Sequence, residues 1–306
     1  MIKIQNNNLE QIAYEHYEAL KNYIEIKSKY KLETIDNWIK DCFGKKWNFK
    51  FIILAKPKEL EELIKKSKCN NDFKYFITLY DYFIERKNPK LRVNNNPYNA
   101  YYLIKKLNIN TCPYCNRNTI YNLNYSSKRT SKLDHFYPKS KYPFLAVSFY
   151  NLIPSCKICN FIKNDSDKKD YINPYDDRFD MNKSVRFTFK ILNSEFYYSL
   201  DGFKISCNLN ESISNDEKNR IKNNIKDFKL FDLYKNHKDI VLELIQKEVI
   251  YNDSYLDELF KSYEGTLFKN REDLQKLVSG GFIEDESINK RPLSKLIKDI
   301  TTELDL

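Results

Sequence analysis

The N-terminal third of the chain shows apolar residues at the three-and-four spacing of an amphipathic helix. The polar positions between them complete the pattern and predict a long helix that begins near residue 9. A second helix is predicted over 72–84, with Asp72 as a favourable N-cap and aromatic residues along one face. The apolar positions of the first helix are Leu9, Ile12, Ala13, His16, Leu20, Tyr23 and Ile24.

The periodicity stops in the polar stretch 87–96, which predicts a linker. Asn96-Pro97 is then expected to cap a short helix over 98–107, because proline is tolerated at the first position of a helix. Residues 1–108 are therefore predicted to form a helical N-terminal region. The next stretch, 109–175, has no long periodic helix.

The C-terminal region, 176–306, begins with strict alternation of apolar and polar residues. This pattern predicts a short β meander of three strands over 185–191, 196–200 and 203–209, with Asp201-Gly202 as the last hairpin turn. From about 214 the helical spacing returns. The predicted fold is mainly α with small β content, in which helical N- and C-terminal regions surround a compact module at 109–175. Further helices are predicted over 240–250, 256–263, 274–278 and 292–304.

Composition narrows the classes of protein that this sequence can encode. Hydrophobic residues make up 42%, enough for a sizeable core. Only five glycines are present, so a glycine-rich phosphate-binding loop is excluded. No apolar run approaches the length of a membrane span, and the first residues lack the apolar stretch of a signal peptide. We expect a cytoplasmic protein with no membrane association, whose cysteines serve as ligands or core residues.

The net charge of +10 and the pI of about 9.0 favour a polyanionic partner, nucleic acid before membrane. The abundance of Lys, Asn, Ile, Tyr and Phe is also what an AT-rich genome produces, so the distribution of charge matters more than its sum. Residues 111–170 hold ten basic and four acidic side chains. More than half of the net charge thus falls in a fifth of the chain.

Two C-x-x-C pairs mark this basic window, separated by 40 residues. Two thiolates three positions apart can share one metal ion, and two such pairs complete the tetrahedral four-sulfur shell that zinc prefers. A closed shell leaves no open position for water, so the predicted zinc is structural. Cys42, Cys69 and Cys207 show no such pairing, and Cys207 is expected to pack in the core. The predicted zinc ligands are Cys112, Cys115, Cys156 and Cys159.

Between and behind the cysteine pairs stand Asp134-His135, Asn151-Leu152 and Cys159-Asn160-Phe161-Ile162-Lys163. In this order they resemble the HNH family of endonucleases, in the subtype that carries two C-x-x-C pairs. The resemblance covers about 109–175 and implies a ββα-metal fold around one catalytic ion. It also implies that Asn151 holds the loop that orients His135. Asp134 stands where the family often has its first histidine, and Asn160 where it has its last.

The chemistry of phosphodiester hydrolysis supports the same assignment. It needs a base to activate water and positive charge on the leaving oxygen. His135 has the pKa range of such a base, and Asp134 and Asn160 offer oxygen ligands suited to Mg²⁺ or Mn²⁺. Because neighbouring side chains on a strand point to opposite faces, Asp134 and His135 are expected at a strand end. Lys163 shares a helix face with Asn160 and is a candidate phosphate contact, as are Lys139 and Lys141.

Outside the module the resemblance is looser. The segment from His135 to Asn160, with its helical flanks, looks like the nuclease subunits of Septu-type anti-phage systems, which work with an ABC-type ATPase partner. That likeness implies a DNA-cleaving effector in bacterial anti-phage defence. A rival interpretation is a non-catalytic zinc-stapled nucleic-acid-binding protein, and another is an adaptor whose helices hold an ATPase. Asp134-His135 favours the nuclease, because a binding module does not need an acid beside a base.

Overall fold

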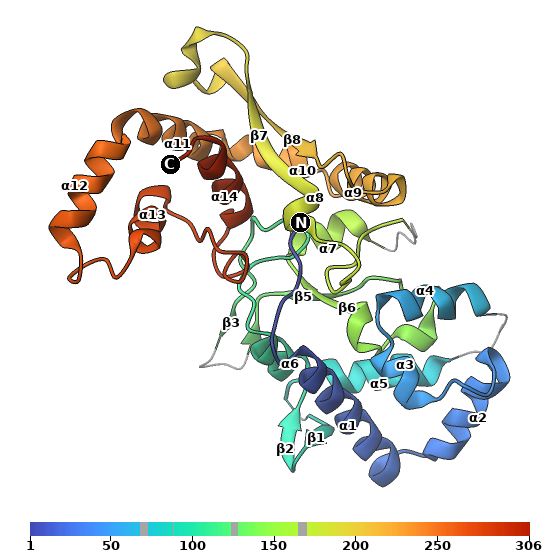
Figure 1. The fold of residues 1–306 in the computed structure, drawn as a ribbon. Helices are drawn as coiled ribbons and strands as arrows, with labels where there is room; N and C mark the ends of the chain where they lie inside the picture. The colour runs from blue at the N-terminus through green and yellow to red at the C-terminus, as the bar shows by residue number, and fades with distance from the viewer. Residues whose placement is uncertain (68–72, 88, 124–127, 165–169) are drawn as a thin grey trace.

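The computed structural model describes residues 1–67, 73–87, 89–123, 128–164 and 170–306. In the colour order of Figure 1, helices from the first third occupy one end, helices from the last third occupy the other, and the middle third lies between them. The fold is mainly α with a few short antiparallel strand pairs, as predicted. One cluster of buried apolar side chains runs through all three parts. The division at 108 and 175 stays a prediction.

The first predicted helix is confirmed as α1, and its apolar stripe is buried against the neighbouring helices. α4 has Pro57 in its first turn, and the side chain of Glu59 bonds back to the Lys56 N–H. The sequence pattern did not predict the three helices between residues 32 and 66 individually. The helices of this region are α1 (Leu9–Lys27), α2 (Leu32–Phe43), α3 (Phe49–Leu54), α4 (Pro57–Lys66), α5 (Lys74–Ile84) and α6 (Ala100–Leu107).

The predicted linker over 87–96 is wrong. β1 (Leu91–Val93) pairs with β2 (Asn96–Tyr98) in an antiparallel hairpin. Asn94 and Asn95 form its turn with φ of 48° and 64°. Two successive left-handed residues are the geometry of a tight hairpin turn, and asparagine tolerates it better than most residues. These asparagines therefore form a hairpin turn and are not part of a linker.

The starts of two helices also differ from prediction. α6 is capped by Asn99, whose side chain accepts hydrogen bonds from the N–H groups of Tyr101 and Tyr102. Pro97 lies in β2 instead, where its missing N–H is not needed at a hairpin edge. Asp72, the predicted cap of the second helix, lies outside the described residues, and α5 begins at Lys74.

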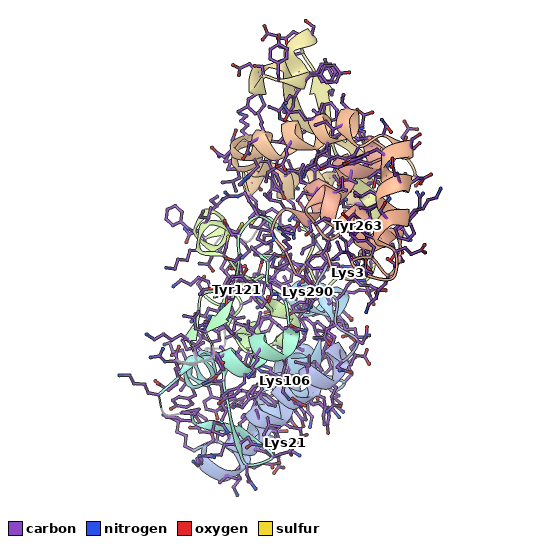
Figure 2. The ribbon with its side chains drawn as sticks, turned by 90° about the vertical axis from the view of Figure 1, so that its left-hand side faces the viewer. Lys3, Lys21, Lys106, Tyr121, Tyr263 and Lys290 are labelled. Carbon is purple, nitrogen blue, oxygen red and sulfur yellow. The ribbon has the colours of Figure 1, made fainter. Side chains whose placement is uncertain are left out.

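The predicted three-stranded meander is a two-stranded hairpin of β7 (Val185–Ile191) and β8 (Phe203–Leu209). The predicted strand over 196–200 is wrong, because two 3-10 turns replace it: η3 (Ser194–Tyr197) and η4 (Leu200–Gly202). Side chains of Asn193 and Ser199 bond to nearby N–H groups and so compete with a strand ladder. A Cβ on Gly202 would lie 2.4 Å from the Phe196 backbone, so glycine permits the close contact of these turns. The hairpin extends away from the body in Figures 1 and 2.

The helices predicted beyond residue 214 are confirmed, with small shifts in their bounds. α14 packs on β7, where the Asp299 carboxylate accepts a hydrogen bond from the Phe187 N–H at 2.8 Å. Lys295 and Asp299 form a buried ion pair at 2.7 Å on the same helix. The helices are α8 (Met181–Ser184), α9 (Asn215–Asp227), α10 (Leu230–Tyr234), α11 (Lys238–Ile250), α12 (Asp253–Tyr263), α13 (Arg271–Ser279) and α14 (Ser294–Glu303).

The structure bears on the expectations about a membrane span and about the unpaired cysteines. Among the residues that the structure describes, no helix is both long and apolar enough to cross a membrane. Cys42, at the end of α2, is disulfide-bonded, so its predicted lack of pairing is wrong. Cys207 packs at the edge of the core on β8, as predicted.

His16 fastens α1 to the middle third. Its ring is fully buried, with Nε2 at 2.9 Å from the Val147 carbonyl oxygen and Nδ1 at 3.2 Å from the Tyr98 hydroxyl. Both ring nitrogens have partners, so this is a satisfied core histidine. Burial lowers its pKa to about 4, although the bond to Val147 acts in the opposite direction.

This pKa predicts an acid-sensitive fold. The unfolded chain takes up a proton on His16 near pH 6.5, whereas the folded chain does so near pH 4. Stability is therefore full above pH 6.5 and falls by about 3 kcal/mol as the pH drops to 4. Urea unfolding of wild type and His16→Gln at pH 7.5 and 4.5 measures this loss. The variant should lose less between the two pH values, and an equal loss would contradict the assignment.

Candidate functional site

The four cysteines of the two C-x-x-C pairs meet in space. Their sulfur atoms all lie within 4.8 Å of one another, and all four side chains are buried. Four thiolates at about 2.3 Å from one zinc ion would lie at comparable separations, so the geometry fits a structural zinc. N–H groups of Arg117 and Cys159 and the amide of Asn118 point at sulfur at 3.3–3.4 Å, which suits thiolate ligands.

The first cysteine pair also ties the middle third to both ends of the chain. The Ile2 N–H bonds to the Pro113 carbonyl at 2.9 Å. Asn116 is fully buried, and its φ of 50° turns the chain after the pair. Its side chain forms hydrogen bonds with the C-terminal segment. Its Oδ1 accepts from the Lys295 N–H at 2.8 Å and its Nδ2 donates to the Ile288 carbonyl at 3.0 Å. The cysteine cluster is thus a junction of three parts of the chain.

Immediately behind the cysteines, two strands and a helix carry the remaining motif residues. β5 (Lys132–His135) pairs antiparallel with β6 (Leu152–Ser155), placing Asp134 opposite Ile153. α7 (Lys157–Lys163) follows β6 after Cys156, which is its N-cap, and packs against β5. His135 is the last residue of β5, so the expectation that Asp134-His135 stands at a strand end is confirmed.

The Asp134 carboxylate is buried and fully engaged. Its Oδ2 accepts a hydrogen bond from the Tyr114 hydroxyl at 2.6 Å and lies 3.1 Å from Lys163 Nζ. The Lys163 ammonium also donates to the His135 carbonyl at 2.7 Å, and its side chain is entirely buried. Burial raises the pKa of Tyr114 well above its ordinary value, so the phenol stays a donor to the carboxylate.

His135 is held in one tautomer. Its Nε2 lies 2.9 Å from the Ala146 carbonyl oxygen, which accepts hydrogen bonds only, so Nε2 carries the proton. Nδ1 is then unprotonated and free to accept a proton in the neutral ring. Burial lowers the His135 pKa to about 3, with Lys139 and Lys163 adding to the shift and the Ala146 bond opposing it. The ring packs on Tyr80 of α5, with centroids 4.5 Å apart.

Asn151 closes the loop that supplies the Ala146 carbonyl. Its Oδ1 accepts from the Tyr137 N–H at 2.7 Å, and its Nδ2 donates to the carbonyls of Tyr137 and Leu145 at 3.1 and 3.0 Å. The side chain is fully buried, so no water replaces these bonds. Asn151 therefore fixes the residue before Ala146, and through it the His135 ring.

Replacing Asn151 with alanine should destabilise the fold by roughly 3 kcal/mol, because three buried backbone groups lose their partner. Urea unfolding measures the change. Asn236→Ala is the matched control, since that side chain is exposed and its two bonds are within its own turn; its effect should stay within about 0.5 kcal/mol. Equal stability of Asn151→Ala and wild type would contradict the claim that Asn151 holds this loop in place.

The structure places the other predicted site residues around this core. Asn160 lies on α7, one turn before Lys163 and partly exposed. Lys139 lies over the Tyr80 ring at 4.3 Å, close enough to His135 to lower its pKa. Lys141 is exposed on the loop that Asn151 closes. Lys163, in contrast, faces inward to Asp134, so its predicted contact with phosphate stays a prediction.

The motif did not indicate three residues that contact the candidate site or the cysteine cluster. Tyr80 comes from the N-terminal helices and contacts both His135 and Lys139. Tyr114 lies between the first two cysteines and reaches Asp134. Asn116 links the cluster to the C-terminal segment. The only sequence signal for the last two is their position within or next to the C-x-x-C pair; Tyr80 has none.

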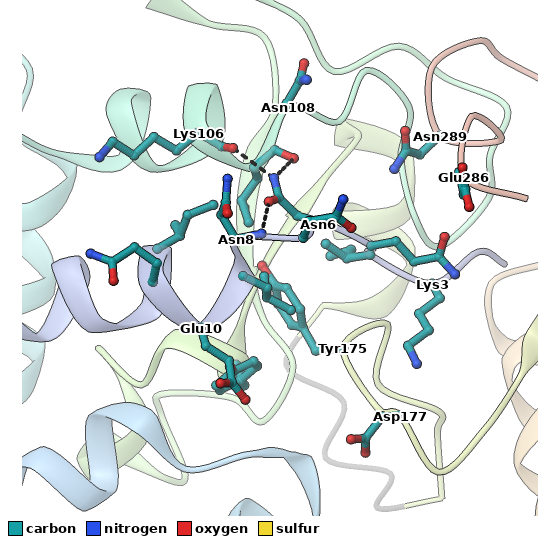
Figure 3. Close-up of a pocket in the computed structure, with 18 of the residues that line it drawn as sticks. Lys3, Asn6, Asn8, Glu10, Lys106, Asn108, Tyr175, Asp177, Glu286 and Asn289 are labelled. Atoms are coloured by element: carbon teal, nitrogen blue, oxygen red, sulfur yellow. Dashed lines mark hydrogen bonds between the residues drawn. The ribbon is translucent and has the colours of Figure 1, made fainter.

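A large cavity of about 1150 Å³ lies elsewhere, between α1, α6 and the segment before α14. Figure 3 shows Asn6 bonded across it to the backbone of α6, with Lys3, Glu10, Asp177 and Glu286 around it. Its lining mixes lysines with a similar number of carboxylates and includes none of the motif residues. Within the described ranges, no second cluster of three or more Cys, His, Asp or Glu side chains accompanies the four cysteines.

Comparisons with known proteins find one partial relative. The Septu protein PtuB of Bacillus thuringiensis is 42% identical over 80 residues, which is 26% of this chain. The matched stretch spans 29% of the length of PtuB, so most of both proteins lies outside it. No protein-family model and no solved structure matches the chain.

Proposed function

We propose that this chain is an HNH-type endonuclease that hydrolyses DNA phosphodiester bonds with the help of a divalent metal ion. The observation that carries the proposal is the fixed tautomer of His135. Its Nε2–H is held by the Ala146 carbonyl, so Nδ1 is left as the basic atom. A buried acid, Asp134, lies next to it in the chain, and a closed cysteine cluster supports both.

In this proposal His135 Nδ1 takes the proton of the attacking water. A ring with a pKa of about 3 is neutral at physiological pH, so it is ready to accept a proton, but it is a weak base. The anionic phosphate of bound DNA favours the imidazolium, which raises the pKa and strengthens the base at the moment of use. Tyr80 and Asn151 serve as positioning residues, because they hold the ring and the loop rather than the reacting atoms.

Asp134 and Asn160 are the proposed ligands of Mg²⁺ or Mn²⁺. Carboxylate and amide oxygens suit these ions, and the two residues lie on elements that contact each other, Asp134 on β5 and Asn160 on α7. The Asp134 carboxylate already attracts one positive charge, the Lys163 ammonium, which supports its assignment as a ligand of a cation. When bound, the ion would stabilise the charge that develops on the leaving oxygen. Lys163 would then share the carboxylate or turn toward phosphate.

The likeness to Septu PtuB supports a role in anti-phage defence. We propose that the chain acts with an ABC-type ATPase as its partner. Large apolar side chains are exposed at the end of the β7–β8 hairpin, including Leu192 and Tyr198 at 56% and 70%. Exposed aromatic and aliphatic groups of this kind are common in protein interfaces.

A second candidate is a non-catalytic zinc-stapled nucleic-acid-binding or adaptor protein. The observation that favours it is the closed state of Asp134, whose oxygens are engaged by Lys163 and Tyr114 as in a structural ion pair. DNA cleavage separates the two candidates. The chain, purified alone and after co-expression with a neighbouring ATPase gene, is incubated with plasmid and Mg²⁺ or Mn²⁺. Cleavage in either preparation supports the nuclease; DNA retention without cleavage in both supports the second candidate.

A further inference from the structure

A second, smaller cavity of about 320 Å³ lies beside the first residues of β5 and the end of α5. Its lining contains cationic side chains and no carboxylate, whereas the cavity of about 1150 Å³ is lined by both. In the part of the chain that the structure describes, none of these cations forms an ion pair with Asp or Glu. The cationic residues are Arg86, Lys128, Arg129, Lys132 and Lys157.

Two of the lining residues, Ser131 and Arg129, are removed from water without gaining, in the described part of the chain, a matching partner for the hydroxyl or a carboxylate for the guanidinium. Ser131 is 4% exposed, and its hydroxyl has no hydrogen-bond partner among the described residues. Arg129 is partly buried, and its Nη1 donates a hydrogen bond to the Ser131 carbonyl at 3.2 Å. Burial lowers the pKa of Arg129, because the guanidinium gives up water and gains no carboxylate. A buried hydroxyl without a partner and a desolvated cation without a counter-ion are both costly, and one bound anion would satisfy both.

We propose that this cavity binds one backbone phosphate of the nucleic acid. The inference rests on the proposed function for the identity of the ligand, and on the cavity for its chemistry. A guanidinium fork, several ammonium groups and a hydroxyl match the oxygens of a phosphate. Lys132 and His135 are the two ends of β5, so the cavity begins about 10 Å from the proposed base, or about three base-pair steps of DNA. The site would hold the strand in register while the bond at His135 is cut.

Equilibrium binding tests this site without cleavage. A labelled DNA duplex is titrated with the full-length His135→Ala protein between 50 and 300 mM salt. The cavity variant adds Arg86→Gln, Lys132→Gln and Lys157→Gln. The matched control instead adds Lys58→Gln, Lys204→Gln and Lys261→Gln, which remove the same charge from exposed positions that do not line the cavity.

The cavity variant should bind at least about tenfold more weakly at 100 mM salt, and its log–log salt slope should fall by about 0.9, the value for one phosphate. Ser131→Ala should weaken binding up to about tenfold with an unchanged slope, because it removes a neutral donor. The charge control should keep the slope of the parent. Equal slopes for the cavity variant and the parent, or the same loss in the control, would overturn the proposal.

Inorganic phosphate separates the two sources of this ligand. If millimolar phosphate raises the melting temperature of the parent but not of the cavity variant, while DNA binding is the same for both, the cavity serves a free phosphate and the backbone assignment is wrong. Competition of phosphate with DNA in the parent alone supports the proposal. Absence of cleavage by wild-type protein would defeat the nuclease proposal and leave these binding results intact.

Discussion

Replacing Cys156 with serine is expected to remove the zinc and unfold the middle third of the chain. Zinc bound by four thiolates supplies folding free energy of order 10 kcal/mol, and losing the zinc would therefore remove about as much free energy as the whole stability of a typical domain. Cys156 is also the N-cap of α7 and accepts hydrogen bonds from Asn118 and Cys159. Because the first cysteine pair contacts both ends of the chain, the damage should spread beyond the cluster. Elemental analysis and circular dichroism during heating measure both effects.

Cys207→Ser is the matched control for this prediction. Cys207 lies half-buried on β8, outside the cluster, so this variant should keep one zinc per chain and a cooperative transition. Wild-type protein purified without chelator should contain the same amount. A zinc-free wild type, or a Cys156→Ser protein that melts like wild type, would contradict the structural zinc.

His135→Ala is expected to lower the rate of DNA cleavage by about 10²–10⁴-fold, the usual effect of removing a general base. Binding of DNA should change little, because the ring is partly buried and neutral. Rates under single-turnover conditions with excess protein measure the chemical step. His237→Ala is the control, since His237 lies outside the β5–β6–α7 site and should leave the rate within about twofold.

Circular dichroism of His135→Ala must match wild type for the comparison to stand, because the His135 ring also packs against Tyr80. A folded His135→Ala protein that cuts at the wild-type rate would show that the base lies elsewhere. A loss of rate in His237→Ala of the same size would show that the effect is not specific to His135.

The sequence predicted the parts of this molecule that depend on local pattern. The stripe of α1 follows from helical periodicity, and the cysteine cluster follows from spacing alone. Asp134-His135 was expected at a strand end because adjacent strand residues face apart, and β5 does end at His135. These are features in which neighbours in sequence are neighbours in space.

The parts that were missed depend on contacts between distant segments. Tyr80 packs on His135 from 55 residues away, and no local pattern connects them. The buried pairing of Lys163 with Asp134 was likewise not indicated by the sequence, since the two residues are 29 positions apart. The alternation over 196–200 looked like a strand, yet the close backbone contact at Gly202 favours two 3-10 turns. Tertiary packing overrides local propensity at these positions.

The most direct test of the nuclease proposal is metal-dependent conversion of supercoiled plasmid to nicked or linear DNA by wild-type protein, with Asp134→Asn as the matched variant. Asp134→Asn keeps the size of the side chain and removes the charge that Lys163 and a metal ion would share. We predict cleavage by wild type in Mg²⁺ or Mn²⁺, alone or with its partner, none without a divalent ion, and a loss of at least about 10²-fold in Asp134→Asn. Cleavage that persists without divalent metal, or that is equal in wild type and Asp134→Asn, would contradict it.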